Sequence, residues 1–224
     1  MQDLIEQERF EMEVLDRLNS GRFLSRLIFC GGTMLRICHG LDRYSVDLDF
    51  RILHPEKASD LFYALQNHLT RHYQLKDAAD KVHTLLYELR SPAYPRSLKI
   101  EIRKESEKVK TEQAIAFSPH STRQVLLRVM TLKAMMASKI AAFIDRGEIR
   151  DAFDMEFLVK KGIVPDGAPE TLREILRRID LLTPSDYSVK LGSLLEAETR
   201  SFYRQKNFAI LRAALQSGMQ IGSG

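Results

Sequence analysis

The stretch of sequence that decides the fold lies between positions 29 and 52. It begins with Phe-Cys-Gly-Gly-Thr at 29–33 and ends with Val-Asp-Leu-Asp-Phe-Arg-Ile at 46–52. The second run alternates apolar and polar residues, which predicts a half-buried β-strand. Because successive side chains of a strand point to opposite faces, we expect Asp47 and Asp49 to lie on one face and their apolar neighbours on the other.

Two carboxylates side by side repel each other unless a cation neutralises them. Oxygen ligands of this kind suit Mg²⁺ or Mn²⁺, so Asp47 and Asp49 are candidate metal ligands. The alternative is an exposed strand that carries two solvated acids. The apolar neighbours of the pair argue against it, because they indicate that the opposite face of the strand is buried.

The glycine pair at the other end of the stretch is a candidate phosphate site. Gly31 and Gly32 allow backbone N–H groups to approach a phosphate closely. We expect a short helix to open at Thr33, whose hydroxyl suits the N-cap position. Taken alone, the pair could equally be a tight strand-to-helix turn, because glycine pairs are common in turns.

Glu101 is a third candidate acid. It lies in the alternating run Leu-Lys-Ile-Glu-Ile-Arg at 98–103, which also predicts a strand. If this strand neighbours the first, three carboxylates lie together and could hold two metal ions about 3.5–4 Å apart. In the alternative, Glu101 is a cross-strand partner of Lys99 or Arg103.

Composition sets broad limits on the protein. The chain has 224 residues, 44% of them hydrophobic, and a formal net charge of +4. This size allows one large domain or two small ones, and the charge permits nucleic-acid contact without requiring it. We find no signal peptide and no apolar run of about 20 residues that could span a bilayer. We therefore expect a cytoplasmic protein without membrane contact, in which Cys30 and Cys38 are free thiols.

The pattern of elements predicts an α+β fold in two domains, 1–120 and 121–224. The first half mixes helices with strands, and the second is helical throughout. We expect the two halves to pack together, because no long linker separates them. The predicted helices cover residues 2–19, 55–72, 125–146, 149–161, 169–179, 185–198 and 206–216. The predicted strands cover 23–30, 46–52, 82–90 and 98–103, and the first of these could instead be the end of a helix that runs into a strand.

The helical half contributes further candidate residues. Lys139 lies on an apolar helical stripe, which is unusual unless its ammonium reaches a partner or a ligand; otherwise it reaches solvent at the helix edge. Four charged residues follow Lys139 within 15 positions: Arg146, Arg150, Asp151 and Asp154. They could form a surface ion network, and Asp151 could instead begin a helix as a cap.

These motifs resemble a known family. The Gly-Gly-Thr of 31–33 and the Arg-Tyr-Ser-Val-Asp-Leu-Asp-Phe of 43–50 resemble the signature of the nucleotidyltransferase superfamily related to DNA polymerase beta. The Lys139 helix and the Arg-Asp-Ala-Phe-Asp of 150–154 then resemble the AbiEii/AbiGii toxin family. Its members are abortive-infection and toxin–antitoxin nucleotidyltransferases. The resemblance implies a mixed β-sheet flanked by helices, followed by a helical domain that completes the active site.

The resemblance also implies a nucleotide site. Gly31, Gly32 and Thr33 would hold the triphosphate of an NTP. Arg43 would contact a phosphate or anchor the loop, and Ser45 belongs to the same motif.

It further implies the catalytic set. Asp47 and Asp49 would bind the metal ions, and Glu101 stands where the family has its third acid. Since glutamate is one methylene longer than the common aspartate, Glu101 could be a metal ligand, a general base or both. Lys139 would bind a nucleotide phosphate, and Asp151 would complete the pocket.

The function predicted on this basis is metal-dependent transfer of a nucleotide from an NTP to an acceptor hydroxyl. By resemblance the acceptor is RNA, in particular a tRNA 3′ end, although a protein side chain would also serve. A toxin of this kind implies a cognate antitoxin protein as a partner. Two alternatives remain open: a two-metal nuclease or phosphotransferase, and a non-catalytic nucleotide- or RNA-binding relative.

Overall fold

The computed structural model describes residues 1–104 and 109–221. Their contacts divide the chain into two compact units. Unit 1 comprises Met1–Gly40 and Tyr44–Thr131, and unit 2 comprises Leu41–Arg43 and the chain from Leu132 onward. Each unit is described by itself below.

Unit 1 is built on a seven-stranded sheet in the described part of the chain. Its strands are β1 (Leu27–Cys30), β2 (Asp47–Ile52), β3 (Gln74–Asp80), β4 (Thr84–Arg90), β5 (Leu98–Arg103), β6 (Thr111–Phe117) and β7 (Gln124–Met130). They lie in the order β3-β4-β5-β2-β1-β7-β6. Strand β2 runs parallel to β5 and antiparallel to β1, so the sheet is mixed. With the helical second half, this confirms the predicted α+β class.

The register of the central strands gives the sheet one buried face. Leu48 pairs with Ile100, which in turn pairs with Tyr87, and all three side chains are fully buried. Paired residues point to the same side of a sheet, so these positions form one continuous apolar face. On the opposite face, Asp47 and Asp49 of β2 and Glu101 of β5, the candidate acids, are half-buried.

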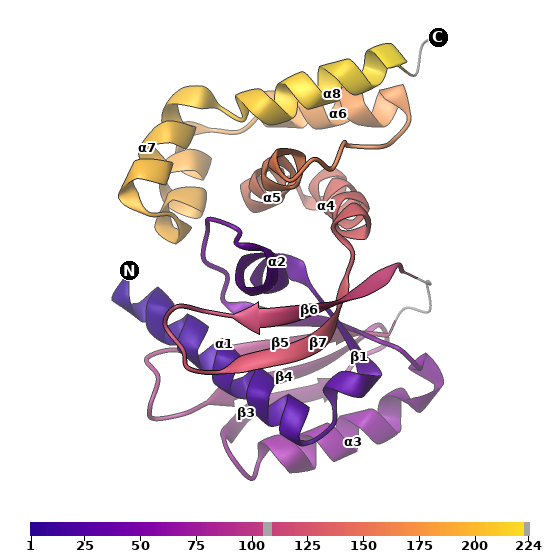
Figure 1. The fold of residues 1–224 in the computed structure, drawn as a ribbon, viewed down its shortest axis with the longest axis vertical. Helices are drawn as coiled ribbons and strands as arrows, with labels where there is room; N and C mark the ends of the chain where they lie inside the picture. The colour runs from indigo at the N-terminus through magenta and orange to yellow at the C-terminus, as the bar shows by residue number, and fades with distance from the viewer. Residues whose placement is uncertain (105–108, 222–224) are drawn as a thin grey trace. The chain divides into compact units, whose positions relative to one another are not determined.

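Helices flank the sheet of unit 1. They are α1 (Gln2–Ser20), α2 (Gly31–His39) and α3 (Ala58–Leu69), with the short turns η1 (Leu24–Arg26) and η2 (Pro55–Lys57). Helix α1 runs beside β7 in Figure 1, and α3 contacts β3 and β4. The Tyr87 hydroxyl donates to the Phe62 carbonyl of α3 at 3.1 Å, which satisfies a polar group inside the apolar layer.

Two predictions for unit 1 are wrong. The helix expected from residue 125 begins only at Leu132, because residues 124–130 form β7. In this segment Val125, Leu127 and Val129 are buried while residues 124, 126 and 128 are exposed, which is the period of a strand. The helix expected to open at Thr33 begins at Gly31 with Cys30 in the N-cap position, so Thr33 is not the cap.

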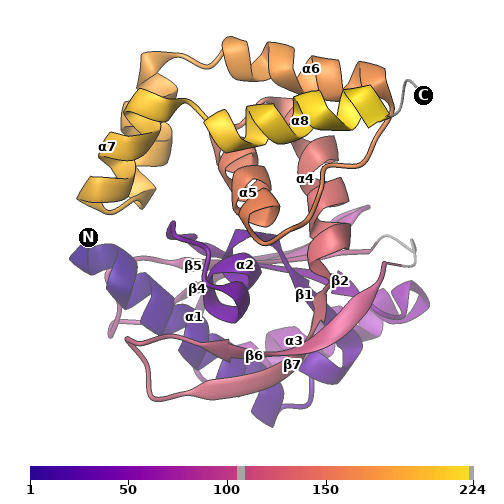
Figure 2. The same cartoon turned by 45° about the horizontal axis from the view of Figure 1, so that its top comes forward.

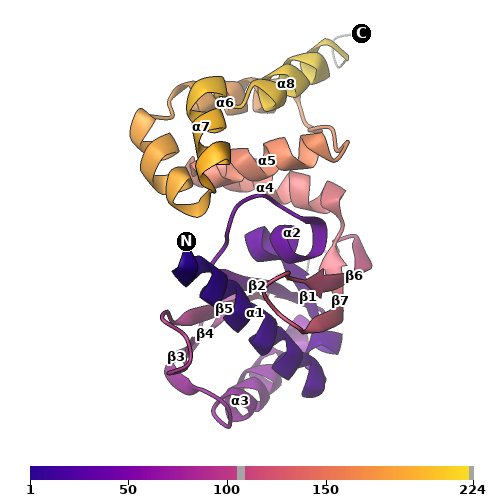
Figure 3. The ribbon, with the colours of Figure 1, turned by 60° about the vertical axis from the view of Figure 1, so that its left-hand side comes forward.

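Unit 2 is helical in the described residues. Its elements are α4 (Leu132–Arg146), α5 (Ile149–Lys160), α6 (Pro169–Asp180), η3 (Asp186–Leu191), η4 (Gly192–Leu194), α7 (Ala197–Lys206) and α8 (Ala209–Ile221). Helix α4 packs on α5, and α6 packs on α8, as Figures 2 and 3 show. The single helix predicted over 185–198 is wrong, because η3, η4 and the start of α7 occupy that segment.

A search of the described helices for a membrane span gave a negative result. None of them is both long enough and apolar enough to cross a bilayer.

Helix α1 buries an unusual acid. Glu11 is fully buried, and neither of its carboxyl oxygens has a hydrogen-bond partner among the described residues. Burial raises the pKa of this carboxyl well above its ordinary value, and the negative charges of Glu8, Asp47 and Asp49 raise it further. Glu11 is therefore a neutral acid over a pH range in which an exposed glutamate is ionised.

We predict that Glu11→Gln stabilises the protein at neutral and higher pH. Because the folded-state pKa is raised, the stability linked to this group is complete below pH 4.5 and is lost as the pH rises toward the folded-state pKa. The glutamine variant does not ionise, so its advantage in the free energy of unfolding grows with pH.

Urea unfolding between pH 4.5 and pH 9 in a chelating buffer measures this effect. The exposed Glu112, on β6, supplies the control variant Glu112→Gln, which leaves the pH profile unchanged. An identical pH profile for Glu11→Gln and the wild type would contradict the assignment.

Candidate active site

The two aspartates of the central motif lie on the half-buried face of the sheet in unit 1. Asp47 opens β2, and Asp49 follows two residues later, so both side chains point to the same face. In the parallel pairing with β5, Asp49 lies beside Glu101 and Asp47 lies beside Lys99. The register thus gathers three carboxylates and one ammonium on neighbouring strands.

Gly31 makes room for this arrangement. Strand β1 ends at Cys30, which pairs with Asp49, and Gly31 then turns the chain into α2. Its φ is +80°, and a Cβ atom placed on it would lie 2.2 Å from Asp49 Oδ2 and 2.8 Å from Asp49 Cβ. Any larger residue would be strained at this φ, and its Cβ would displace the Asp49 carboxylate. Glycine is therefore required for its backbone conformation and for its lack of a side chain.

Thr33 holds the backbone of the aspartate strand. Its side chain is fully buried, and Oγ1 donates to the Asp47 carbonyl at 2.6 Å. Cys30 Sγ donates to the Asp49 carbonyl at 3.4 Å. The Thr33 hydroxyl, expected to cap a helix, thus contacts β2, and the turn fixes the strand through two hydrogen bonds.

Helix α1 contributes positioning residues that sequence reasoning missed. Gln7 is fully buried, and its amide donates to the carbonyls of Val46 at 3.1 Å and Ser97 at 3.4 Å. It thereby joins the segments that lead into β2 and β5. These hydrogen bonds join residues far apart in the chain, so no local pattern in the sequence marked Gln7.

A second tie from α1 reaches α2. Glu8 is buried and pairs with Arg36, whose guanidinium carbon lies 3.7 Å from the centroid of the Tyr44 ring. Buried acids pair with cations because an isolated charge is costly in an apolar environment. The pair therefore anchors α2 beside the aspartate strand.

The acids fit a divalent cation that also binds substrate. Within residues 1–104 and 109–221, no group of three His, Cys, Asp or Glu side chains is close enough to hold an ion. Asp47 and Asp49 still offer two carboxylates on one face. Mg²⁺ commonly takes only one or two protein carboxylates and completes its shell with water and substrate phosphates. The donor set therefore suits a cation that binds together with a phosphate substrate.

Unit 2 contains a buried ion network. Arg43 binds Asp154 through two hydrogen bonds of 2.7 Å, and Lys139 Nζ lies 2.7 Å from Asp154 and 3.1 Å from Asp151. Arg146 binds Asp151 at 2.8 and 2.9 Å. Both aspartates are completely buried, and Lys139 is 7% exposed. The network is therefore internal, and the alternative of a surface ion network is wrong.

Charge balance keeps the network ionised. Burial alone would lower the pKa of Lys139, but attraction by Asp154 and Asp151 outweighs it and the pKa is raised. Burial alone would raise the pKa of Asp154, but Arg43 and Lys139 outweigh it and the pKa is lowered. The loop of residues 41–43 is thus fastened to α4 and α5 by charged groups.

Ser45, the remaining predicted site residue, is half-buried in the segment between the loop of 41–43 and β2. It belongs to unit 1, whereas Arg43 belongs to unit 2. The structure therefore groups the predicted residues in two sets. Gly31, Gly32, Thr33, Ser45, Asp47, Asp49 and Glu101 lie in unit 1, and Arg43, Lys139 and Asp151 lie in unit 2.

Comparison with protein families decides the identity. The family described as the nucleotidyl transferase AbiEii toxin of type IV toxin–antitoxin (TA) systems matches residues 13–218. The chain belongs to this family. The match extends from α1 to α8 and includes both sets of candidate residues, which confirms the resemblance seen in the motifs.

Solved structures show the same fold as this AbiEii family member. A Helicobacter pylori protein provisionally named a nucleotidyltransferase aligns with TM-score 0.60 and 19% identity over 96% of each chain. JHP933 from Helicobacter pylori aligns with TM-score 0.59 and 22% identity over 96% of this chain and 93% of its own.

A third similar structure is a toxin. MenT4, a nucleotidyltransferase toxin of Mycobacterium tuberculosis H37Rv, aligns with TM-score 0.54 and 16% identity over 96% of this chain and 94% of its own. No curated protein matched the chain.

We predict that Gly31→Ala lowers nucleotide transfer by about a hundredfold, because a shift of the Asp49 carboxylate by about 1 Å suffices for such a loss. Gly40→Ala is the matched control. Gly40 has nearly the same φ, +79°, but its Cβ would meet nothing within 4 Å. It should lose about 1 kcal/mol of stability and keep its activity. If the two variants lost activity equally, backbone strain alone would explain the loss, and displacement of the Asp49 carboxylate would be contradicted.

We predict that Asp154→Asn lowers the free energy of unfolding by about 3–5 kcal/mol, because it leaves Arg43 and Lys139 with an uncompensated buried charge. The control is Asp180→Asn. Asp180 forms an ion pair with Arg212 and is 64% exposed, so about 1 kcal/mol or less is expected. Urea unfolding at pH 7 separates the two.

The pH dependence gives a second check on Asp154. Its folded-state pKa is lowered, so the stability it contributes is present above pH 3.8 and is lost as the pH falls through the folded-state value. The difference between wild type and Asp154→Asn should therefore shrink in acid. A difference that is independent of pH would contradict an ionised Asp154.

Proposed function

We propose that this protein transfers a nucleotide from an NTP to an acceptor hydroxyl, with Mg²⁺ or Mn²⁺ as the metal. One observation carries the proposal: the carboxylate of Asp49, on the same face as that of Asp47, lies against the Gly31 turn that opens α2. A pair of metal-ligating oxygens next to a helix N-terminus suits a substrate that is both polyanionic and metal-bound.

The triphosphate would lie at the N-terminus of α2. The first N–H groups of a helix have no partner within the helix, and the helix dipole favours negative charge there. Gly31 and Gly32 leave these amides uncovered by a side chain at the start of the helix. The Thr33 hydroxyl already donates to the backbone carbonyl of Asp47. We therefore propose that Thr33 binds the triphosphate through its backbone amide.

Asp47 and Asp49 would hold the metal, with Glu101 beside Asp49 in register. When bound, the metal neutralises the phosphate oxygens and the charge that develops on them. The acceptor oxygen attacks the α-phosphorus, the bond from this phosphorus to the bridging oxygen breaks, and pyrophosphate leaves. The acceptor proton passes to Glu101 if this residue acts as the base. Positioning and charge neutralisation supply most of the rate enhancement.

Unit 2 has a proposed role of its own. By resemblance to the family, Lys139 binds a nucleotide phosphate and Asp151 helps complete the site, with Arg43 and Ser45 as further contacts. The Lys139 ammonium lies between two carboxylates, so its charge is already partly balanced. These assignments stay predictions. Lys139→Met in the transfer assay described below tests the first of them.

The family supports a proposal for the acceptor and for the partners. We propose RNA, and a tRNA 3′ end in particular, as the acceptor. The family description names a type IV toxin–antitoxin system, which supports a cognate antitoxin as the partner of this toxin. The substrates, NTP and tRNA, are consistent with action in the cytoplasm.

We predict that Asp47→Asn and Asp49→Asn each lower transfer by at least about a hundredfold, because each removes an oxygen charge that balances the metal. The assay incubates the protein with total tRNA, Mg²⁺ and each α-labelled NTP in turn, and measures label in RNA and mass change by mass spectrometry. Asp77→Asn is the control, since Asp77 is an exposed aspartate on β3. Chelation of the metal should abolish the signal.

The same assay separates the alternatives. RNA that shortens without gaining label would indicate a two-metal nuclease. Toxicity and RNA binding that survive Asp47→Asn, with no label incorporated from any NTP, would indicate a non-catalytic binding protein. Either outcome would reject nucleotidyl transfer.

A further inference from the structure

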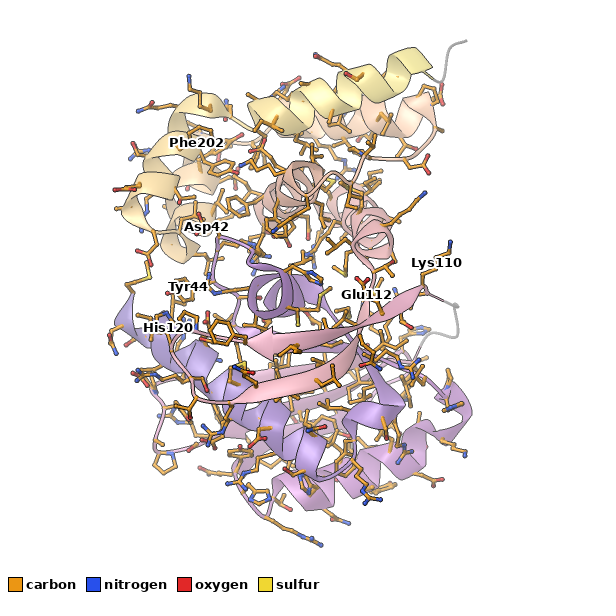
Figure 4. The ribbon with its side chains drawn as sticks, viewed as in Figure 1. Asp42, Tyr44, Lys110, Glu112, His120 and Phe202 are labelled. Atoms are coloured by element: carbon orange, nitrogen blue, oxygen red, sulfur yellow. The ribbon has the colours of Figure 1, made fainter. Side chains whose placement is uncertain are left out.

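A pocket in unit 2 is lined by residues outside the proposed catalytic set. It has a volume of about 480 Å³. It is lined by Asp42, Phe153, Phe157, Lys160, Glu198, Thr199, Phe202 and Tyr203. Figure 4 labels Phe202 on α7 and Asp42 on the loop of residues 41–43. The volume lies within the range of small-molecule sites and exceeds what a single protein side chain would fill.

The pocket is aromatic. The ring of Phe153 lies 4.7 Å from that of Tyr203, and the ring of Phe202 meets Tyr203 edge-on at 5.3 Å. Phe202 remains 43% exposed although it is a large apolar side chain. An exposed aromatic ring at the rim of a pocket is a platform on which a planar ligand can stack.

Lys160 is the one cation among the described residues that line the pocket, and its charge is already paired within the protein. Lys160 Nζ donates to the Tyr203 hydroxyl at 2.8 Å and lies 3.4 Å from the buried Glu156. It also lies 5.2 and 5.8 Å from the centroids of the Tyr203 and Phe202 rings. Its charge is therefore engaged within the protein.

The remaining charge of the lining is negative. Asp42 accepts a hydrogen bond from Thr199 at 3.0 Å, which orients its carboxylate. Glu198, one residue earlier on α7, is exposed and has no ion pair or side-chain hydrogen bond among the described residues. The pocket thus combines aromatic faces with carboxylate acceptors, and its ligand must be planar and rich in N–H donors.

Guanine matches this chemistry among the nucleobases. Its Watson–Crick edge presents two adjacent N–H donors, N1–H and N2–H, which one carboxylate can accept together. Adenine, cytosine and uracil each present an acceptor next to their donor on that edge, which a carboxylate repels. The arginine side chain of a protein partner offers a similar fork, but it would leave most of a 480 Å³ pocket unfilled.

We propose that this pocket binds an unstacked guanine of a single-stranded segment of RNA, stacked on Phe202 and hydrogen-bonded to Glu198. The inference rests on the proposed function for its choice of RNA as the ligand. Recognition of unpaired bases by stacking and by their Watson–Crick edges is the usual way in which proteins read single-stranded RNA.

The site shares its elements with the buried ion network. Arg43 and Asp154 form the bidentate ion pair of that network. Their neighbours in the chain, Asp42 and Phe153, line the pocket. The network therefore fixes both the loop and the helix that line the pocket. A preformed site of this kind loses little ordering entropy when it binds.

The test measures RNA binding without chemistry. An Asp47→Asn background, with no NTP and no divalent cation, is titrated against fluorescein-labelled UUGUU and, separately, UUAUU, and Kd is read from anisotropy. UUGUU should bind more tightly. Phe202→Ala should weaken this binding about 5- to 100-fold, as expected for the loss of one stacked base. Phe202→Tyr, which keeps an aromatic ring, should bind as the parent does.

Matched variants separate the site from general effects. Phe117→Ala removes a similarly exposed aromatic ring, on β6, and should leave Kd unchanged. Glu198→Gln should abolish the difference between UUGUU and UUAUU, whereas Glu196→Gln, on an exposed neighbour outside the pocket, should keep it. Thermal unfolding of each variant verifies that it is folded.

Three results would overturn the proposal. The first is an unchanged Kd for Phe202→Ala. The second is displacement of UUGUU by GMP at concentrations near the Kd of the RNA, which would assign the pocket to a free nucleotide. The third is tighter binding of an arginine-containing peptide, lost in Phe202→Ala, which would assign it to a protein partner. Because neither NTP nor metal is present, failure of nucleotidyl transfer does not affect this test.

Discussion

The close approach of the Gly31 backbone to the Asp49 side chain is the constraint on which the arrangement of unit 1 depends. The space that a Cβ atom would need is filled by the Asp49 carboxylate, so β1, the turn and β2 can meet only through a glycine. This contact places the Asp49 carboxylate next to the start of α2, with Asp47 on the same face of β2. Hydrogen bonds from Thr33 and Cys30 to carbonyls of β2 then hold the strand at that distance.

Unit 2 depends on a different interaction, the buried network of Arg43, Lys139, Arg146, Asp151 and Asp154. In the interior, Arg43 and Lys139 compensate Asp154 and Asp151, where a single charge would be costly, and the half-exposed Arg146 pairs with Asp151 from the edge of the network. The network ties the three-residue loop at 41–43 to α4 and α5, which carry the family's Lys and Arg-Asp-x-x-Asp motif. Charged residues that the family resemblance assigns to nucleotide binding are thus also structural in this unit.

Local patterns were sufficient where one physical signal dominated. Strict alternation predicted β2 and β5, since each has one buried face, and Gly21 marked the end of α1. The same approach failed at 124–130, where a strand that runs directly into α4 has apolar residues compatible with either period. It also missed Gln7, because a hydrogen bond across 39 residues leaves no local pattern in the sequence.

By itself, the sequence determined the chemistry of the candidate site and the family: two carboxylates at period two, a glycine pair and the Arg-Asp-x-x-Asp run are properties of residue type and spacing. Only the tertiary structure decided how each group is used. It showed that Thr33 holds a strand and that the buried Glu11 carboxyl has no hydrogen-bond partner in the described part of the chain. It also showed that Lys139 lies between two aspartates and that four aromatic side chains line one pocket. The physical reason is that burial, pairing and close approach depend on atoms brought together from distant parts of the chain, whereas residue type and periodicity do not.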